Sequence, residues 1–208
     1  MESILFTLTV LIVSIIIHEV AHGYAAYALG DPTAKLAGRL TLNPVPHIDL
    51  VGSILIPGLL VLSQSTLLFG WAKPVPYNPY NLKNARWGEA IVGFAGVGTN
   101  LLLAVIFALV ARFTFGTGLE AFTAPAATIA FVNLFLGMFN LIPLPPLDGY
   151  TVLRGLLPTR FSLMFRDFEE KIMRGGIFSL ILILFIFSMF LAKPFSLLVQ
   201  SVFRLLVG

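Results

Sequence analysis

A short segment near the start of the chain, HEVAH, holds three side chains that could do chemistry together. His18 and His22 are four residues apart, so on a helix they lie on one face, where two imidazole nitrogens can bind one metal ion. Glu19 stands beside them and could take a proton from a water molecule. Two zinc ligands and a general base in this spacing are typical of hydrolases that use a bound zinc ion.

A catalytic zinc site takes three protein ligands and keeps one position open, so a third ligand is needed. The chain has no cysteine, and the positions where soluble zinc hydrolases of the pattern HExxHxxGxxH have glycine and a third histidine hold Ala25 and Ala28. Asp148, in FNLIPLPPLDGYTVLRG, is the remaining buried candidate, because its carboxylate needs a cation and three prolines before it force an extended approach. The alternative role for Asp148 is to cap a helix N-terminus, and residue chemistry leaves both roles open.

The HEVAH segment lies inside an apolar stretch from Ile4 to Leu29. As a helix this stretch would be about 39 Å long, which exceeds the hydrocarbon core of a bilayer, about 30 Å. Charged residues inside such helices cost about 2.5 to 3.5 kcal/mol each and are functional by default. Of the whole chain, 58% is hydrophobic and 11% is charged, against about a quarter charged in soluble domains. The net charge of +3 is too small to indicate a nucleic-acid partner.

Further apolar runs long enough to cross a bilayer occupy residues 88–112, 123–143 and 175–192. A last apolar run, 195–207, is short for a crossing and is predicted to be interfacial or partial. We therefore predict an all-α polytopic membrane protein with about four to five transmembrane helices. It is expected to be a single membrane-embedded domain over residues 1–208, with a core at 4–157 and extra C-terminal helices at 158–208.

The connection between the first two spans, residues 31–86, consists of apolar pieces that glycine and proline interrupt every few residues. Irregular backbone at membrane depth persists only where protein or a watery cavity satisfies its amides, so we expect a small re-entrant β or loop element here. Prolines at the ends of short strands suggest an exposed sheet edge. We hypothesise that residues 36–42 clamp an unwound substrate by adding it to this edge.

Basic residues predict the orientation of the chain, because loops rich in lysine and arginine stay in the cytoplasm. The connection 31–86 contains Lys35, Arg39, Lys73, Lys83 and Arg86. The stretch after the third span contains Arg154, Arg160, Arg166, Lys171 and Arg174, whereas the other side has only Arg112, Lys193 and Arg204. The first helix is therefore expected to end in the cytoplasm, which places the HEVAH segment near the cytoplasmic side of the bilayer.

Three motifs in order, HEVAH, GVGTN (Gly96 to Asn100) and NLIPLPPLDG (Asn140 to Gly149), give the chain a resemblance to the site-2 proteases. These are intramembrane zinc metalloproteases, and the chain resembles their minimal subgroup without appended regulatory domains. The resemblance implies one zinc ion per chain, with His18, His22 and Asp148 as ligands and Glu19 as the base. It also implies single-span transmembrane proteins or peptides as substrates, in regulated intramembrane proteolysis or the clearance of signal-peptide remnants.

Two further pairs of residues are candidates for the site. Asn100 and Asn140 match polar positions of the family that are thought to hold substrate or the oxyanion, although either could simply join helices by hydrogen bonds. His47 and Asp49 are two residues apart in NPVPHIDL and are interpreted as a pair that orders the loop. A gating role for His47, in which it admits water or occupies the open position of zinc, is the alternative.

A function from another class, a metal-dependent membrane transporter or channel, is the main alternative to proteolysis. Transporter folds often show repeated halves and broken helices in symmetric positions, and no such repeat is visible in this chain. A transporter also has no need of Glu19 between the metal ligands. The membrane zincins that process prenylated peptides are a second alternative, but they would require a helical glutamate ligand in place of Asp148.

Overall fold

The computed structural model describes residues 2–62 and 71–208, and the regular structure in this part of the chain is helical. Four helical stretches are long and apolar enough to cross a membrane. They are Ile4–Ala28, Trp87–Thr114, Glu120–Asn140 and Ile181–Val207. The predicted all-α polytopic membrane protein is thus confirmed.

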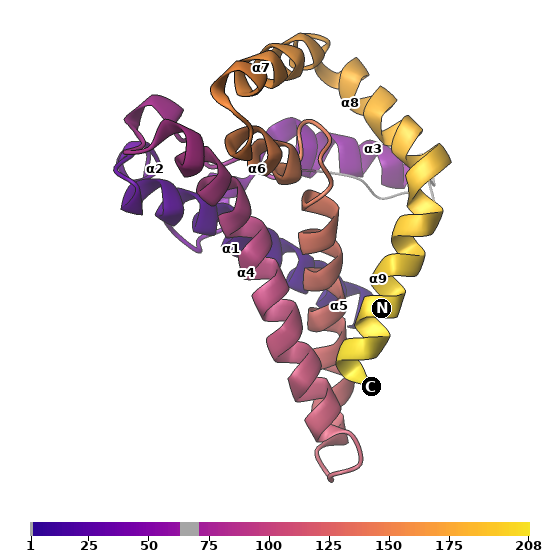
Figure 1. Cartoon of the computed structure of the whole chain (residues 1–208). Coiled ribbons are helices and arrows are strands. Elements are labelled where there is room, and N and C mark those ends of the chain that lie inside the picture. The colour runs from indigo at the N-terminus through magenta and orange to yellow at the C-terminus, as the bar shows by residue number, and fades with distance from the viewer. Residues whose placement is uncertain (1, 63–70) are drawn as a thin grey trace.

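The core of the molecule is a hairpin of two long helices with a third helix packed across it. Helices α4 (Ala85–Thr114) and α5 (Thr123–Asn140) run side by side and meet in a turn at the narrow end of the molecule, and the short η4 (Glu120–Phe122) leads into α5 (Figure 1). Helix α1 (Glu2–Ala28) passes behind this hairpin and packs against both of its helices.

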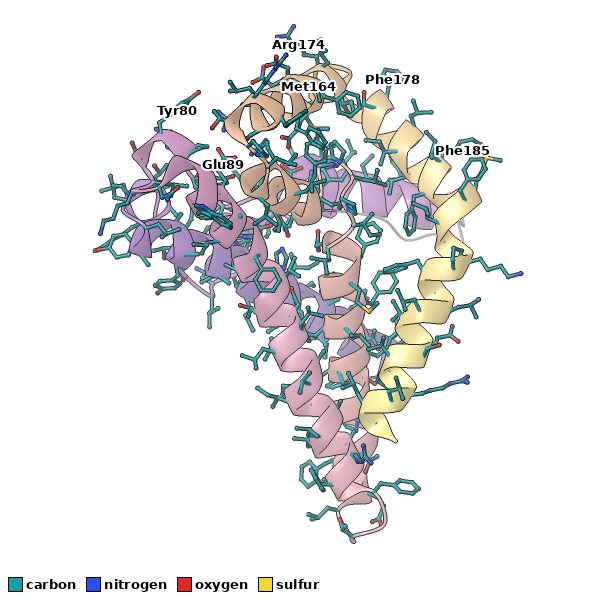
Figure 2. The ribbon with its side chains drawn as sticks, in the orientation of Figure 1. Tyr80, Glu89, Met164, Arg174, Phe178 and Phe185 are labelled. Atoms are coloured by element: carbon teal, nitrogen blue, oxygen red, sulfur yellow. The ribbon has the colours of Figure 1, made fainter. Side chains whose placement is uncertain are left out.

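The last candidate span corrects the prediction that residues 195–207 are only interfacial or partial. Helix α8 (Gly176–Ile186), the π-helical η5 (Phe187–Leu191) and α9 (Ala192–Val207) follow one another without a loop, so residues 195–207 belong to the fourth candidate span. Pro194 does not end the helix because it lies in the first turn of α9, where a missing N–H costs little. Phe178 and Phe185 project from α8, 80% and 59% exposed (Figure 2), and Phe185 lies within this candidate span.

The connection between the first two spans does not contain the predicted strands within its described residues. It contains α2 (Thr33–Leu36), η1 (Val45–His47), the π-helical η2 (Leu50–Leu55), α3 (Ile56–Leu62) and η3 (Pro79–Asn81). Residues 37–42 are mostly turns and bends, and Gly38 there has a positive φ of 65°, which suits a turn and not a strand. The predicted sheet edge at 36–42 is therefore wrong.

Helices α6 (Asp148–Leu156) and α7 (Thr159–Arg174) lie at the end of the molecule opposite the α4–α5 turn (Figure 1). A buried network of charges joins them to α4. Glu89 of α4 is 2% exposed and is labelled in Figure 2. Its carboxylate accepts a hydrogen bond from Nε of Arg154 on α6 at 3.0 Å, and another from Arg166 on α7. Arg154 also pairs with Glu169 of α7. Buried charges persist only when paired, so this network fixes α6 against α4.

Asp31, just after α1, holds the end of that helix against a distant part of the chain. Its carboxylate is 0% exposed and accepts hydrogen bonds from Thr33, from the Asn78 backbone N–H at 2.7 Å, and from Asn81 Nδ2 at 2.8 Å. Burial raises the pKa of Asp31, but these hydrogen bonds favour the charged form and hold its pKa below the usual range. The charged carboxylate therefore stabilises the folded state.

We expect Asp31→Asn to lower the free energy of unfolding near neutral pH by about 2 kcal/mol, because an uncharged amide cannot accept all of these hydrogen bonds. Since the folded pKa is depressed, the contribution of the carboxylate is present above its unfolded pKa, about 3.9, and is lost as the pH falls through the lower folded value. Thermal unfolding in detergent over a descending pH series should show the gap between wild type and variant closing in acid. Asp167→Asn, on the exposed side of α7, is the control, and a gap that widens in acid would contradict this account.

Candidate metal centre

The three predicted ligands converge although Asp148 is far from the histidines in the sequence. The Nε2 atoms of His18 and His22, both on α1, lie 3.0 Å apart. Asp148 is the first residue of α6, and its Oδ2 atom lies 2.9 Å from His18 Nε2 and 3.4 Å from His22 Nε2. In the described part of the chain these three side chains form a group that could hold a metal ion.

The other nitrogen of each imidazole ring bonds to helix α4. His22 Nδ1 lies 2.7 Å from the backbone oxygen of Val92, and His18 Nδ1 lies 2.5 Å from Asn100 Oδ1. Oxygen atoms of this kind accept hydrogen bonds, so each Nδ1 carries the proton of its ring and each Nε2 carries a lone pair. Metal-binding histidines are usually held through their second nitrogen in this way.

These contacts test whether the site fits a metal ion. Two nitrogen lone pairs and the Asp148 Oδ2 atom all face one point, and that oxygen is buried without a hydrogen-bond partner among the described residues. Three acceptors so close together repel one another unless a cation lies between them. A tetrahedral ion with bonds of about 2.0 Å separates its ligands by about 3.3 Å, near the observed distances, so the residues fit a metal ion.

Glycines on α4 allow that helix to reach the imidazole rings. A Cβ atom on Gly96 would lie 2.5 Å from His22 Nε2 and 2.7 Å from His18 Cε1, closer than real Cβ atoms approach. Asn100, one turn later on the same face, then reaches His18 Nδ1. The GVGTN motif thus provides space for the ligands at Gly96 and a partner for one of them at Asn100.

The NLIPLPPLDG segment turns the chain so that Asp148 faces α1. Leu147 stands at the N-cap of α6, so Asp148 is not the helix cap that was considered as its alternative role. Gly149 is packed so tightly that a Cβ atom would collide with the backbone carbonyl of Leu141. The turn therefore depends on a glycine directly after the acid.

Glu19, the predicted base, lies on the face of α1 that the connection 31–86 covers. Its Oε2 atom accepts a hydrogen bond from the backbone N–H of Val75 at 2.7 Å. Pro74 and Pro76 have no N–H, so among these three residues Val75 supplies the one backbone N–H donor. A residue that precedes proline, as Val75 does, favours extended backbone. A short extended stretch therefore orients the carboxylate of Glu19.

The two predicted asparagines have different surroundings. Asn100 is 0% exposed, and its amide bonds to His18 and, through Nδ2, to Asn133 at 2.8 Å. In this structure Asn100 therefore holds a histidine, and its substrate role stays a prediction. Asn140, the last residue of α5, donates to the Leu136 carbonyl of its own helix and is partly exposed, so its substrate role stays a prediction.

The pair formed by His47 and Asp49 orders the loop through separate contacts. His47 is 2% exposed and its Nε2 lies 2.9 Å from the Thr41 backbone oxygen, while its own backbone oxygen accepts the Lys73 N–H. Asp49 caps η2 by accepting from the N–H of Gly52 at 2.7 Å. His47 is not part of the group that could hold a metal ion, and a gating role for it stays a prediction.

Two polar residues that the sequence analysis did not consider lie next to the site. Asn133, on α5, bonds to Asn100 and to Ser14, which is on α1 one turn before His18. Both are buried, at 0% and 3% exposure. The signal that could have found Asn133 is an amide inside an apolar span, where an unpaired polar group is costly.

Comparison with known proteins places the chain in a family. A model of peptidase family M50 matches residues 118–183, which include Asp148 and not α1. The chain is 46% identical over 158 residues to YwhC of Bacillus subtilis, a candidate zinc metalloprotease by name, covering 71% of this chain and 67% of YwhC. It is 32% identical over 165 residues to Rip2 of Mycobacterium tuberculosis, also named a candidate zinc metalloprotease, covering 74% of this chain and 62% of Rip2. The zinc metalloprotease MJ0392 of Methanocaldococcus jannaschii is 25% identical over 160 residues, covering 77% of this chain and 36% of MJ0392. No solved structure matches the chain significantly.

The similarity to YwhC, of which this chain covers two thirds, shows that the chain belongs to peptidase family M50, the site-2 protease family. The resemblance found in the three motifs is thus confirmed. The predicted class of enzyme, a metalloprotease, is confirmed with it. The four apolar spans make it a membrane metalloprotease.

We expect Gly96→Ala to weaken metal binding strongly, because the added methyl group displaces both imidazole rings from their common point. Loss of a partner that orients a ligand typically costs about 10 to 100-fold in metal affinity, and a direct collision should cost at least as much. The measurement is the zinc dissociation constant of purified protein, by competition with a chelating dye. Gly58→Ala is the matched control, since a Cβ atom there meets nothing within 4 Å. Wild-type affinity in Gly96→Ala would contradict the packing described above.

Proposed function

We propose that the chain is an intramembrane zinc endopeptidase that hydrolyses peptide bonds of single-span transmembrane proteins or peptides. One observation carries the proposal. His18, Glu19 and His22 lie on α1, a helix long and apolar enough to cross a membrane, and α6 brings Asp148 to the same point. A hydrolytic site at this place acts on a substrate that is itself in the membrane.

His18, His22 and Asp148 would hold one zinc ion per chain. Two imidazole nitrogens and a carboxylate oxygen suit zinc, and a catalytic site with three protein ligands keeps a fourth position for water or substrate. The names of YwhC, Rip2 and MJ0392, which all refer to zinc metalloproteases, support this metal. When bound, zinc would polarise the carbonyl group of the peptide bond and lower the pKa of a water molecule.

Glu19 moves the proton that hydrolysis requires. It follows His18 directly in the sequence, and the Val75 N–H bonds to one of its oxygens, which leaves the second oxygen to accept a proton. Glu19 takes this proton from the attacking water as the C–O bond forms, and gives it to the amine nitrogen as the C–N bond breaks. The hydrogen bond from Val75 keeps the carboxylate in one orientation during both transfers.

A cavity beside α1 suits an apolar substrate segment. It has a volume of about 530 Å³, within the usual range of binding sites, and its lining is mostly apolar. Ile15 and Ile16 of α1 line it together with His47 and Trp71, and Ile15 is one turn before Glu19 on the same face. The reacting peptide bond must be extended, because carbonyl groups in a helix are already hydrogen-bonded.

The active site is proposed to lie near the cytoplasmic side of the bilayer. Support comes from the fold, in which the basic segments around α2 and on α6 and α7 lie at the same end of the molecule, opposite the α4–α5 turn (Figure 1). Segments rich in lysine and arginine stay in the cytoplasm.

Single cysteines should report this orientation cleanly, because the chain has none of its own. Cysteine at Lys35, Lys83 or Arg160 should be protected from an impermeant thiol reagent in intact cells and react once the cells are opened. Cysteine at Thr117, in the α4–α5 turn, should react in intact cells. The opposite pattern would show that the molecule is inverted in the membrane.

Glu19→Gln should separate zinc binding from catalysis, because glutamine is nearly isosteric and cannot accept the proton. Removal of a general base typically costs about 10² to 10⁴ in rate, and more where the same group also protonates the leaving amine. Purified wild type and variant are mixed in detergent with a single-span peptide that contains helix-breaking residues, and cleavage and zinc content are measured. Glu120→Gln, at the far end of the hairpin, is the matched control and should cleave normally.

The variant should retain zinc and bind the peptide without cutting it. Cleavage by Glu19→Gln at a rate comparable to wild type would refute the role of Glu19. A metal transporter, the alternative function, would show altered metal flux and no cleavage by either protein.

A further inference from the structure

A chain of hydrogen bonds runs from the metal centre into the interior through three helices. His18 Nδ1 bonds to Asn100 Oδ1, Asn100 Nδ2 donates to Asn133 Oδ1 at 2.8 Å, and Asn133 Nδ2 donates to Ser14 Oγ at 2.9 Å. The four residues are 6%, 0%, 0% and 3% exposed, and they come from α1, α4 and α5. Because water has little access to them, each polar group depends on its neighbours in the chain.

The two metal-binding histidines differ in what holds their second nitrogen. His22 faces the backbone oxygen of Val92, which can only accept, so its proton must lie on Nδ1. His18 faces the side-chain amide of Asn100, which can present either its oxygen or its NH₂ group. If the amide turned over, His18 Nδ1 would have to accept, and the proton of the ring would move to Nε2, the nitrogen needed for the metal.

A second hydrogen bond of Asn133 decides which way round the Asn100 amide lies. Asn133 Nδ2 also donates to the backbone oxygen of Ile129 at 2.9 Å, and this oxygen can only accept. The nitrogen of Asn133 therefore faces Ile129 and Ser14, and its oxygen faces Asn100. The oxygen can only accept, so the nitrogen of Asn100 must point to it and the oxygen of Asn100 must point to His18.

We propose that Asn133 is a positioning residue of the metal centre, which keeps the His18 proton on Nδ1 by holding the Asn100 amide in one orientation. Asn133 touches neither the metal nor the substrate, and acts through two other side chains. The inference rests on the metal-binding role of His18 proposed above. It assigns a function to an amide inside α5 that would otherwise count only as a link between helices.

A double-mutant cycle separates this role from simple packing. Asn133→Leu removes every polar atom while keeping the volume, so the Asn100 amide is free to turn over. Asn100→Asp has no NH₂ group to turn toward His18. One of its oxygens accepts from His18 Nδ1, and the other is protonated where it faces the Asn133 oxygen and needs no partner where residue 133 is leucine, so the proton stays on His18 Nδ1 in both cases. If Asn133 acts by orienting Asn100, it matters in the wild-type background and is dispensable in the Asn100→Asp background.

Two readouts are made on each purified variant. The first is the zinc dissociation constant, by competition with a chelating dye. The second is the ¹⁵N NMR spectrum of histidine-labelled protein, with and without zinc, which shows which nitrogen of each ring bears the proton. The chain has three histidines, so His22→Ala and His47→Ala variants suffice to assign the His18 signals.

Asn133→Leu should weaken zinc binding about tenfold, the low end of the effect typical of residues that orient metal ligands, and should give metal-free His18 a population protonated at Nε2. In the Asn100→Asp background the same substitution should change zinc affinity by less than about twofold. Thr128→Val, which removes a hydroxyl that donates to the Ala124 carbonyl within α5, is the control and should behave as wild type.

Asn133→Ser is a second disrupting variant in case leucine is not tolerated, because serine can bond to the carbonyl of its own helix and is too short to reach Asn100. Asn133→Asp should restore the wild-type spectrum, since a buried neutral acid can donate to Ile129 and accept from Asn100.

An equal loss of zinc affinity in both backgrounds would show that Asn133 only packs, and so would a disrupting variant with wild-type affinity and a wild-type His18 spectrum. A wild-type protein that binds no zinc would instead contradict the proposed function, while the metal-free spectra would still decide the role of Asn133.

Discussion

Two imidazole nitrogens and a carboxylate oxygen, all acceptors, face one another at 2.9 to 3.4 Å in the interior of the molecule. In the protein interior, where water does not solvate these atoms, such a cluster is unfavourable unless a cation is bound between them. Both Nδ1 atoms bond to oxygens on α4, so neither ring can relieve the repulsion by turning its protonated nitrogen inward. Residues of α1, α4 and α6 hold this cluster together directly, and α5 reaches it through the hydrogen bond between Asn133 and Asn100.

The contacts around the cluster repeat one spacing, the four-residue step of a helix. His18 and His22 are separated by this step on α1, Gly96 and Asn100 on α4, and Asn133 bonds to the Ile129 carbonyl one turn before it on α5. Each helix thereby presents one face to the same point. The ion pair between Glu89 and Arg154 then fixes α6 against α4, and α6 brings Asp148 to the Nε2 atoms of the two histidines.

The parts of the structure that depend on local pattern were predictable from the sequence. The three motifs HEVAH, GVGTN and NLIPLPPLDG led to the correct family and to three residues that meet, and the length of the apolar runs led to the membrane-spanning helices. The predicted sheet edge at 36–42 was wrong because it rested on prolines at the ends of short segments, which did not reveal the turn at Gly38. The roles of Asn133 and Val75 could not be predicted, because each depends on a partner distant in sequence whose position only the fold determines.

X-ray absorption at the zinc edge, measured on purified wild type and on Asp148→Ala and His47→Ala variants, tests the central claim most directly. The account predicts about one zinc ion per wild-type chain, bound by two imidazole nitrogens and oxygen ligands only, as a three-ligand site with two histidines requires. Asp148→Ala should lose most of this zinc, and His47→Ala should keep it with an unchanged spectrum. Zinc that is lost from His47→Ala and retained by Asp148→Ala would contradict the assignment of the metal centre.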